Sequence, residues 1–517
     1  MKKIHIYLLS AILFAGFLSC TKFLDRKSPM TLSPEDAYNT VEKCGYAIGG
    51  LMDNFTSYGY IGRNLTIYGD LFCDNVTTVR SHSGHFYDVE NWNISTSHQD
   101  VSTIWGNSYI IAARAVDAII GINKLIAEGG DIKRLEVYKG AALSIKVYCE
   151  WILAQYFCLP YNEENKTTNG IILIGDSKIG IEEEVHTSNL GDTYKQMVSE
   201  IDTVIALYTR NDTKIVSYNT SPNWAYLPSL SMAYILKSRI MLDMGRYAEA
   251  INACDLALSS ITDKKIVSTV AELKEMYKAE ATPTPEEIWT VYFDISTQLS
   301  ANAINNFYSS YGAWISEPVR KLFYEKTPLL SDIRYVLYRD TVLVEDSVFS
   351  FCGKYPNKNN VNNVPIMRLP EIYYNKAEAQ AKSGDVSGAK NTIFEVISKR
   401  NPLVTDIAAM ETIYSTGNTE NEFIDFLLSD RRREFAGEGL RWFDLRRNSR
   451  RLTREIIEGK VSFRKTFTNY PLSKTCLPIP NAETDTRQWG GKQNEIWFSG
   501  SPTIPLPSEG EDYTDKY

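Results

Sequence analysis

The segment from Trp224 to Leu258 constrains the fold more than any other feature of this chain. It holds two apolar helical runs, one before and one after Gly245. Glycine readily adopts the left-handed backbone conformation of a tight turn. Ala250 and Ala257 are small enough to let two helices approach closely, and Tyr247 supplies a ring to fill the gap between them. The pattern predicts an antiparallel helical hairpin.

A second segment, Ile372 to Ser398, follows the same plan. Gly384 stands at its turn and Ala389 at its first close-packing position, while Val386 replaces the aromatic plug. The spacing in both hairpins is similar to that of tetratricopeptide repeats. Such units bury their apolar faces by stacking on one another, so further helices are expected beside these two hairpins.

Other long runs supply those helices. Ile104 to Ile126 and Val137 to Phe157 carry apolar residues at helical spacing, and a further pair follows Thr193. We therefore expect a mainly α fold of about four tetratricopeptide-like units, with long loop-rich insertions and a few short strands. The insertions are the segments without sustained helical periodicity, Asn54 to Thr103, Tyr292 to Asp340 and Arg454 to Tyr517.

The run from Asp430 to Arg447 interleaves charged and aromatic residues at helical spacing. Aromatic and leucine side chains supply an apolar face on both sides of the break at 437–439. The glycines of that break predict a corner between two short helices. Because arginine is costly to bury unless it is paired, we expect a structural ion-pair network to hold the two helices. Phosphate or nucleic-acid binding is the alternative interpretation. Residues three apart share a helix face, which predicts the pairs Asp430 with Arg433, Arg431 with Glu434, Arg441 with Asp444, and Asp444 with Arg447.

The first twenty residues have the pattern of an export signal. Lys2 and Lys3 form a charged start, and the apolar run from Ile4 to Leu18 is too short for a membrane span. Ser19 then precedes Cys20 as in a lipoprotein cleavage box. We expect residues 1–19 to be a signal peptide and the Cys20 thiol to carry a diacylglycerol anchor. A plain secretory signal, with Cys20 incidental, is the alternative.

Composition is that of a large exported globular protein. The net charge of −8 argues against a nucleic-acid partner, and the hydrophobic fraction of 44% is ordinary for a folded body. The length favours two closely packed subregions, which we expect at 20–215 and 216–517. The cysteines after Cys20 are odd in number and widely scattered, so we expect buried thiols rather than disulfides or a zinc site.

Catalytic motifs are missing from the sequence. It contains no H-E-x-x-H, G-x-S-x-G, Walker A or dinucleotide-binding pattern. His82, His85 and Asp88 could meet on one loop, but histidines at that spacing are common by chance. We therefore expect no catalytic residue, no metal site, no cofactor and no enzymatic activity. Binding is the better-supported class of function.

Aromatic residues make up 12% of the chain, with tyrosine the most abundant at 32 residues. Exposed tyrosine and tryptophan rings stack on sugar rings or peptide side chains, and their polar edges form hydrogen bonds. Two loop clusters combine such rings with amide groups: His85–Tyr87 together with Asn91–Asn93, and Asn306–Tyr308 together with Tyr311 and Trp314. Trp105 and Trp289 have apolar neighbours in regular segments, so we expect both in the core.

Three stretches resemble the SusD/RagB family: Asp430 to Arg447, Val364 to Ala379 and the L-P-I-P motif at Leu477 to Pro480. With the N-terminus, this resemblance spans nearly the whole chain. It implies a SusD-like fold in an outer-membrane lipoprotein of Bacteroidetes-type bacteria that faces the cell exterior. It also implies a SusC-like TonB-dependent transporter as partner, contacted by the helical repeats.

The same resemblance implies that the protein captures an oligomeric nutrient and delivers it to the transporter. We expect the ligand to be a glycan; a peptide, as in RagB-type members, and a scaffold role without a small ligand are the alternatives. The family's ligand-bearing loops match the two aromatic clusters by region and not residue by residue. The expected ligand contacts are Phe86, Tyr87, Trp92, Tyr308, Tyr311 and Trp314.

Overall fold

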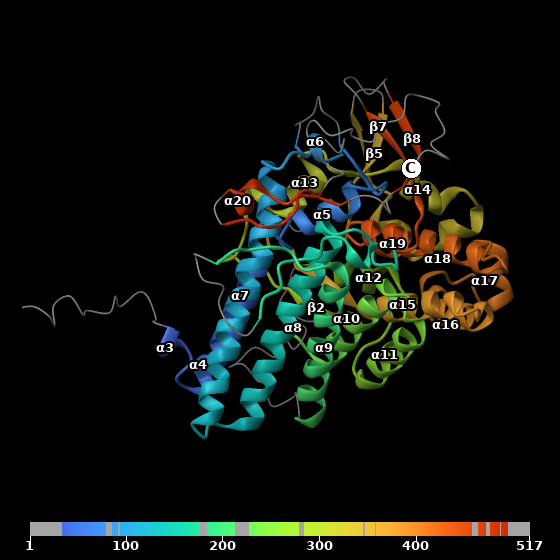
Figure 1. Cartoon of the computed structure of the whole chain (residues 1–517). Coiled ribbons are helices and arrows are strands. Elements are labelled where there is room, and N and C mark those ends of the chain that lie inside the picture. The colour runs from blue at the N-terminus through green and yellow to red at the C-terminus, as the bar shows by residue number, and fades with distance from the viewer. Residues whose placement is uncertain are drawn as a thin grey trace, which may run out of the picture.

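The computed structural model describes residues 34–78, 85–90, 94–175, 183–211, 227–278, 284–344, 347–356, 358–457, 464–471, 476–485 and 488–494. Helices dominate; strands β5, β7 and β8 lie at one end of the molecule, whereas β2 lies among the helices (Figure 1). The expected mainly α architecture is confirmed. The expected signal peptide and Cys20 lie outside the described residues, and so does the expected subregion boundary at 215/216.

A curved row of antiparallel helices forms the body of the protein (Figure 1). Each helix packs against the next, and α15 also contacts α18. The row explains the sequence periodicity, because each helix buries a stripe of its own apolar residues against the helices on either side. Its members are α7 (Gln99–Ala127), α8 (Ile132–Phe157), α9 (Leu190–Arg210), α10 (Leu230–Asp243), α11 (Tyr247–Ser260), α15 (Leu369–Lys382) and α16 (Val386–Arg400).

Both predicted hairpins are confirmed. Gly245 (φ +68°) and Gly384 (φ +88°) take left-handed backbone conformations at the two turns, which an L side chain rarely adopts. Ala250 and Ala389 are fully buried where the paired helices meet. The Asp385 side chain caps α16 by accepting a hydrogen bond from the Gly388 N–H. Local sequence therefore specifies these turns.

The remaining helices and strands connect or cover this row. Short helices are α3 (Pro34–Ala37), α4 (Val41–Asp53), α5 (Asn64–Leu71), α6 (Tyr87–Glu90), α12 (Val270–Met276), α13 (Ile304–Ser309), α14 (Glu317–Tyr324), α17 (Ile407–Tyr414), α18 (Glu420–Phe435), α19 (Arg441–Arg447) and α20 (Asn481–Thr484). The 3₁₀ turns are η1 (Asn54–Thr56), η2 (Asn165–Thr167), η5 (Ser300–Asn302), η6 (Thr327–Ser331) and η7 (Ile333–Leu337). The strands are β1 (Val76–Thr77), β2 (Glu287–Val291), β3 (Trp314–Ile315), β4 (Thr341–Val344), β5 (Ser347–Ser350), β6 (Val364–Arg368), β7 (Arg451–Ile457) and β8 (Arg464–Pro471).

Antiparallel strand pairs join segments that are far apart in the sequence. The largest sheet has the order β1-β3-β5-β4, and its β1–β3 pair places Thr77 opposite Trp314. In the β2–β6 pair, Trp289 lies opposite Met367. The sheets therefore tie the first aromatic loop region to the second and hold both against the helical body.

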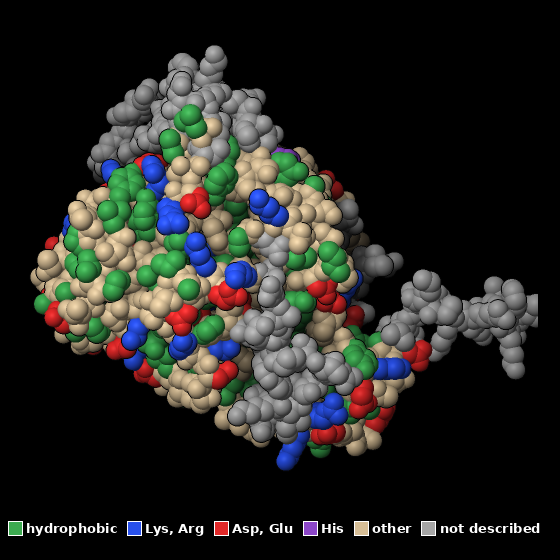
Figure 2. Space-filling view, turned by 180° about the vertical axis from the view of Figure 1, so that it is seen from behind, with side chains coloured by type: hydrophobic (Ala, Val, Ile, Leu, Met, Phe, Trp, Pro, Cys, Tyr) green, Lys and Arg blue, Asp and Glu red, His purple; other side chains and the backbone are tan. Residues whose placement is uncertain are grey.

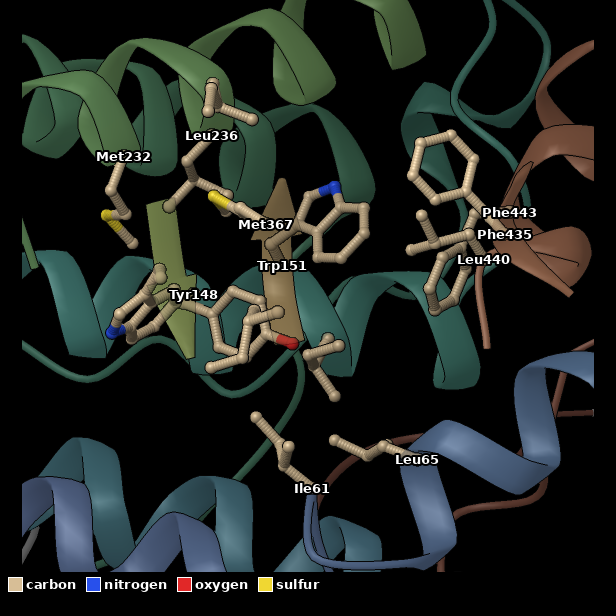
Figure 3. Packing of buried hydrophobic residues seen from close by; sticks show 14 of the residues in the cluster. Ile61, Leu65, Tyr148, Trp151, Met232, Leu236, Met367, Phe435, Leu440 and Phe443 are labelled. Atoms are coloured by element: carbon tan, nitrogen blue, oxygen red, sulfur yellow. The ribbon is translucent and has the colours of Figure 1, made fainter. Parts of the chain in front are cut away.

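The core lies where early and late parts of the chain meet (Figure 3). The Trp289 ring packs on Phe55 and Tyr148, with centroid distances of 5.5 and 5.0 Å. Trp151 of α8 meets Phe443 of α19 edge to face at 4.9 Å. Trp289 and Trp105 are 0% and 3% exposed, so their expected places in the core are confirmed. The seven described cysteines are likewise buried, as predicted.

Candidate functional site

The two aromatic loop clusters predicted from the sequence meet in space. The Phe86 ring lies 5.1 Å from the Phe307 ring, and the His85 ring lies 5.1 Å from the Tyr311 ring. Phe307 and Tyr311 also contact each other, at 5.0 Å. Segments more than two hundred residues apart therefore form one continuous group of rings beside α6 and α13 (Figure 1).

Arg63 joins these loops. Its guanidinium lies over the rings of Phe307 and Phe86, at 4.6 and 5.3 Å from their centroids, and 4.8 Å from that of Tyr58. Such cation–ring contacts are favourable, and arginine also stacks through its flat face. We call the group the aromatic junction; its members are Tyr58, Arg63, His85, Phe86, Phe307 and Tyr311.

Polar groups hold the Arg63 side chain in place. Its Nη1 donates to the Asn302 side chain at 2.9 Å, and its Nε donates to the Asn64 side chain at 2.8 Å. Asp100 forms an ion pair with Arg63 at 3.5 Å and also accepts from the Tyr68 hydroxyl. Burial lowers the pKa of Arg63 below its ordinary value. Arg63 thus connects three chain segments at one point.

The aromatic junction is partly open to solvent. His85 is exposed, Phe86 and Tyr311 are half-buried, and Tyr58 is 41% exposed. Phe307 is buried beneath them. Partly exposed rings of this kind present apolar faces that a flat ligand can cover.

Strained backbone conformations gather around these rings. Phe86 has φ +59°, and Ser300 and Asn360 have φ +49° and +64°. For residues other than glycine such angles are uncommon, and they tend to occur where function constrains the chain. Asn306 links the latter two, since its amide donates to the Ser300 carbonyl and the Asn360 side chain. These asparagines add hydrogen-bonding groups beside the rings.

Two of the expected ligand contacts, Tyr308 and Trp314, are each 1% exposed. Tyr308 stacks on Tyr355 at 5.6 Å, and Trp314 stacks on Phe349 at 4.7 Å. The expected exposed ring face of Trp314 is therefore wrong, because the ring is buried and stacks on Phe349 of the neighbouring strand β5. The structure shows a packing role for both rings, and a direct ligand contact from either stays a prediction.

The other expected contacts divide between the described and undescribed parts of the chain. Phe86 and Tyr311 belong to the aromatic junction. The Tyr87 side chain and all of Trp92 lie outside the described residues. Neither Arg63 nor Tyr58 was predicted from the sequence, because both lie outside the two loop clusters and only the fold brings them to those rings.

The charged run forms a buried ion-pair network, as predicted. Glu434 contacts Arg400 and Arg368 at 2.8 Å each and Arg334 at 3.3 Å. Glu286 also pairs with both Arg368 and Arg400. Burial alone would raise the pKa of Glu434, yet these arginines hold it well below its ordinary value. A carboxylate so enclosed serves the fold rather than a ligand.

Two of the four pairs expected within the run are wrong. Arg431 pairs with Asp444 at 2.8 Å, so Glu434 is left to the arginines of other elements. Arg441 pairs with Asp74 at 3.0 Å. The other two pairs, Asp430 with Arg433 and Asp444 with Arg447, are confirmed. Buried arginines select the carboxylates that the tertiary packing brings into reach, not the nearest in sequence.

The glycine corner after α18 is held by the first part of the chain. Gly437 and Gly439 take left-handed backbones, and their N–H groups donate to Asp70 at 2.6 and 3.2 Å. Gly69 lies so close to Gly439 that an added side chain would meet the Gly439 carbonyl oxygen at 1.8 Å. Only glycine fits this contact. The corner therefore locks α5 against α18 and α19.

Neither a metal-ligand cluster nor a membrane-spanning helix is found among the described residues. Within the ranges given above, no group of three or more His, Cys, Asp or Glu side chains could hold a metal ion. In that same part of the chain, no helix combines the length and apolarity needed to cross a bilayer. Basic and acidic side chains alternate across the face seen in Figure 2.

Comparison with known proteins agrees with this architecture. The model of the SusD family matches residues 352–497. A SusD superfamily protein from Bacteroides vulgatus is 20% identical, with 90% of this chain and 100% of that chain covered and a TM-score of 0.72. One from Bacteroides thetaiotaomicron is 21% identical, covering 88% and 99%, with a TM-score of 0.73.

A SusD-like carbohydrate binding protein from Bacteroides vulgatus is 16% identical, covers 88% of this chain and 98% of that chain, and has a TM-score of 0.69. No curated protein matches the sequence. At these identities the solved structures establish the fold, and the family model covers α18, α19 and their glycine corner. Residues 352–497 thus match the SusD family model, and the chain as a whole has the fold of the solved SusD superfamily proteins.

Proposed function

We propose that the protein is a cell-surface binding protein that captures an oligomeric nutrient, a glycan, at the aromatic junction. The observation that carries the proposal is the convergence of the two aromatic loops around Arg63. Partly exposed rings offer stacking faces, and the neighbouring asparagine amides offer the hydrogen-bonding groups that sugar hydroxyls need. The carbohydrate-binding description of one structural relative supports the same class of ligand.

We further propose delivery of the ligand to a SusC-like TonB-dependent transporter. The curved row of helices from α7 to α16 would form the partner face, since stacked helical repeats commonly bind proteins. Lipid on Cys20 would hold the protein at the outer membrane, facing outward. Cys20→Ala should then release a folded protein from the membrane fraction of cells that lack the transporter, because acyl chains supply the anchoring energy. Retention of this variant would contradict the lipid anchor.

Native gels cast with individual polysaccharides test the glycan proposal. The protein should be retarded on at least one polysaccharide, and Phe86→Ala and Tyr311→Ala should both reduce the retardation. Tyr46→Ala is the matched control, since Tyr46 lies on α4, is 62% exposed and is outside the aromatic junction. Equal losses in all three variants would count against the junction as the site.

Two further outcomes would replace the glycan proposal. Copurification of a mixture of short peptides, without retardation on any gel, would favour a RagB-like peptide-binding protein. Stable association with the transporter, without any small ligand, would favour a scaffold. The same preparations serve all three tests, so the outcomes are directly comparable.

A further inference from the structure

An open surface pocket lies far from the aromatic junction. It has a volume of about 650 Å³ and is lined by residues of α14, η6, α16, α17 and α18. Figure 1 shows α17 at the edge of the molecule, well separated from α6 and α13. Small-molecule sites commonly have volumes of ~300–1,000 Å³. We call this cavity the α17 pocket.

A tightly specified loop forms one wall of the α17 pocket. Ser415 ends α17 in a left-handed conformation (φ +56°), and Gly417 follows with φ +72°. A side chain added at Gly417 would meet Glu422 at 2.2 Å, so only glycine fits there. Thr419 and Glu422 then form a capping box that begins α18. The loop is thus fixed from both ends.

The floor of the α17 pocket combines apolar and aromatic side chains. Tyr414 and Phe426 lie edge to face, with their ring centroids 6.3 Å apart, and Leu329 lines the same pocket. The Arg433 guanidinium packs over the Tyr414 ring at 5.0 Å and donates to the Leu322 carbonyl. These groups form a floor suited to an apolar substituent.

Carboxylates at the rim of the α17 pocket already have partners. Glu411 pairs with Lys390 at 2.5 Å, and Asp425 pairs with Arg450 at 2.8 Å. Glu422 accepts the backbone N–H groups at its capping box, which lower its pKa. Glu325, which also lines the pocket, lies 4.0 Å from Lys321. Each rim carboxylate therefore has a partner other than Lys326.

Lys326 differs from the other cations of this pocket. Its ammonium donates to the Ser415 hydroxyl at 2.6 Å and lies 3.5 Å from the Ile413 carbonyl oxygen. Within the described ranges, no carboxylate pairs with it, whereas Lys390 and Arg433 both have one. Lys326 is also exposed. Its charge is thus available to an anionic group that enters the pocket.

We propose that the α17 pocket binds a small organic carboxylate that carries an apolar group. The ligand's carboxylate would contact Lys326, as charge-assisted hydrogen bonds favour, and its apolar group would cover the floor at Leu329, Tyr414 and Phe426. The carboxyl-terminal residue of a peptide and a short fatty acid share this chemistry. This site is independent of the aromatic junction.

Calorimetric titration with defined probes tests the proposal. N-acetyl-L-phenylalanine represents a peptide terminus, and 4-phenylbutyrate represents a fatty acid. At least one should bind with a stoichiometry of one, and Lys326→Gln should weaken that binding about tenfold, the scale of a lost charge-assisted hydrogen bond. Whichever probe binds more tightly identifies the source of the carboxylate.

Matched controls separate this site from nonspecific attraction. Lys399→Gln removes an exposed charge on α16 outside the pocket lining and should leave the affinity unchanged. Phe86→Ala, in the aromatic junction, should also have no effect, so failure here is distinguishable from failure of the glycan proposal. Three results would overturn the inference: no binding of either probe, equal binding of N-acetyl-L-phenylalanine amide, or equal binding of glucuronate, which lacks the apolar group.

Discussion

The protein buries arginine in two different environments. Arg400 in the ion-pair network is fully buried and pairs with Glu286 and Glu434 at 2.8 Å each. Burial alone would lower the pKa of Arg400, but these carboxylates raise it above its ordinary value. Arg63 in the aromatic junction has one carboxylate at 3.5 Å and three rings, and its pKa is lowered.

The comparison separates folding from binding. The opposite charges of the network pair with each other, so they offer no unpaired charge to a ligand. Removing one charged side chain leaves its partners buried in the interior without a counter-charge. The aromatic junction instead compensates its cation with rings that stay partly exposed on their other faces. Substitutions in the network should therefore change stability, and substitutions in the junction should change affinity.

Glu434→Ala should have the largest effect on stability. It removes the carboxylate that contacts Arg334, Arg368 and Arg400, and breaking a buried ion pair commonly costs ~3–5 kcal/mol. Denaturant unfolding measures the loss. The control, Glu249→Ala, breaks an exposed pair with Arg246 and should change the free energy of unfolding by less than ~1 kcal/mol. Equal effects of both substitutions would mean that the network does not stabilise the fold.

Trp314→Ala tests whether a predicted ligand residue belongs to the core. A buried tryptophan replaced by alanine typically costs ~3–5 kcal/mol through the cavity left behind. Trp314 is 1% exposed, so the melting temperature should fall sharply while ligand affinity of the folded protein persists. Tyr311→Ala should show the reverse pattern. Lost affinity at an unchanged melting temperature would restore Trp314 as a ligand contact.

Asp70→Asn tests the link between α5 and the glycine corner through pH. Burial raises the pKa of Asp70 to about 6, against an ordinary value of 3.8. The folded state thus holds the proton more tightly than the unfolded state. The stability contributed by this proton is fully present below the unfolded pKa and is lost as the pH rises through about 6.

The free energy of unfolding of the wild type, minus that of Asp70→Asn, should therefore fall by about 2–3 kcal/mol between pH 4 and pH 7. Urea unfolding at four pH values measures this difference, and other titrating groups cancel because both proteins contain them. A difference that is constant with pH, or that rises, would contradict the raised pKa.

Arg63→Lys should have the smallest effect on the free energies. Lysine keeps the charge but loses the flat guanidinium that contacts three rings and two asparagines. Ligand affinity should weaken by ~1–2 kcal/mol, on the scale of cation–ring contacts, with little change in melting temperature. Calorimetry with the polysaccharide identified on the gels measures the ligand affinity, and a melting curve gives the melting temperature. Unchanged affinity would show that Arg63 does not position the binding rings.

Local features of this protein follow from its sequence alone. The hairpins at 224–258 and 372–398 depend on glycine turns and small residues a few positions away, so their pattern survives in any fold that contains them. The core positions of Trp105 and Trp289 follow from apolar neighbours. The structural role of the charged run follows from the cost of burying unpaired arginine.

Tertiary structure decided which groups meet. Arg431 lies three residues from Glu434 yet pairs with Asp444, because Glu434 faces arginines brought by β6 and α16. Arg63 reaches Phe307 only because the fold brings their loops together, and Trp314 is buried because its ring stacks on Phe349 of β5. Periodicity reports the environment along one helix or strand, whereas these contacts depend on how distant segments pack.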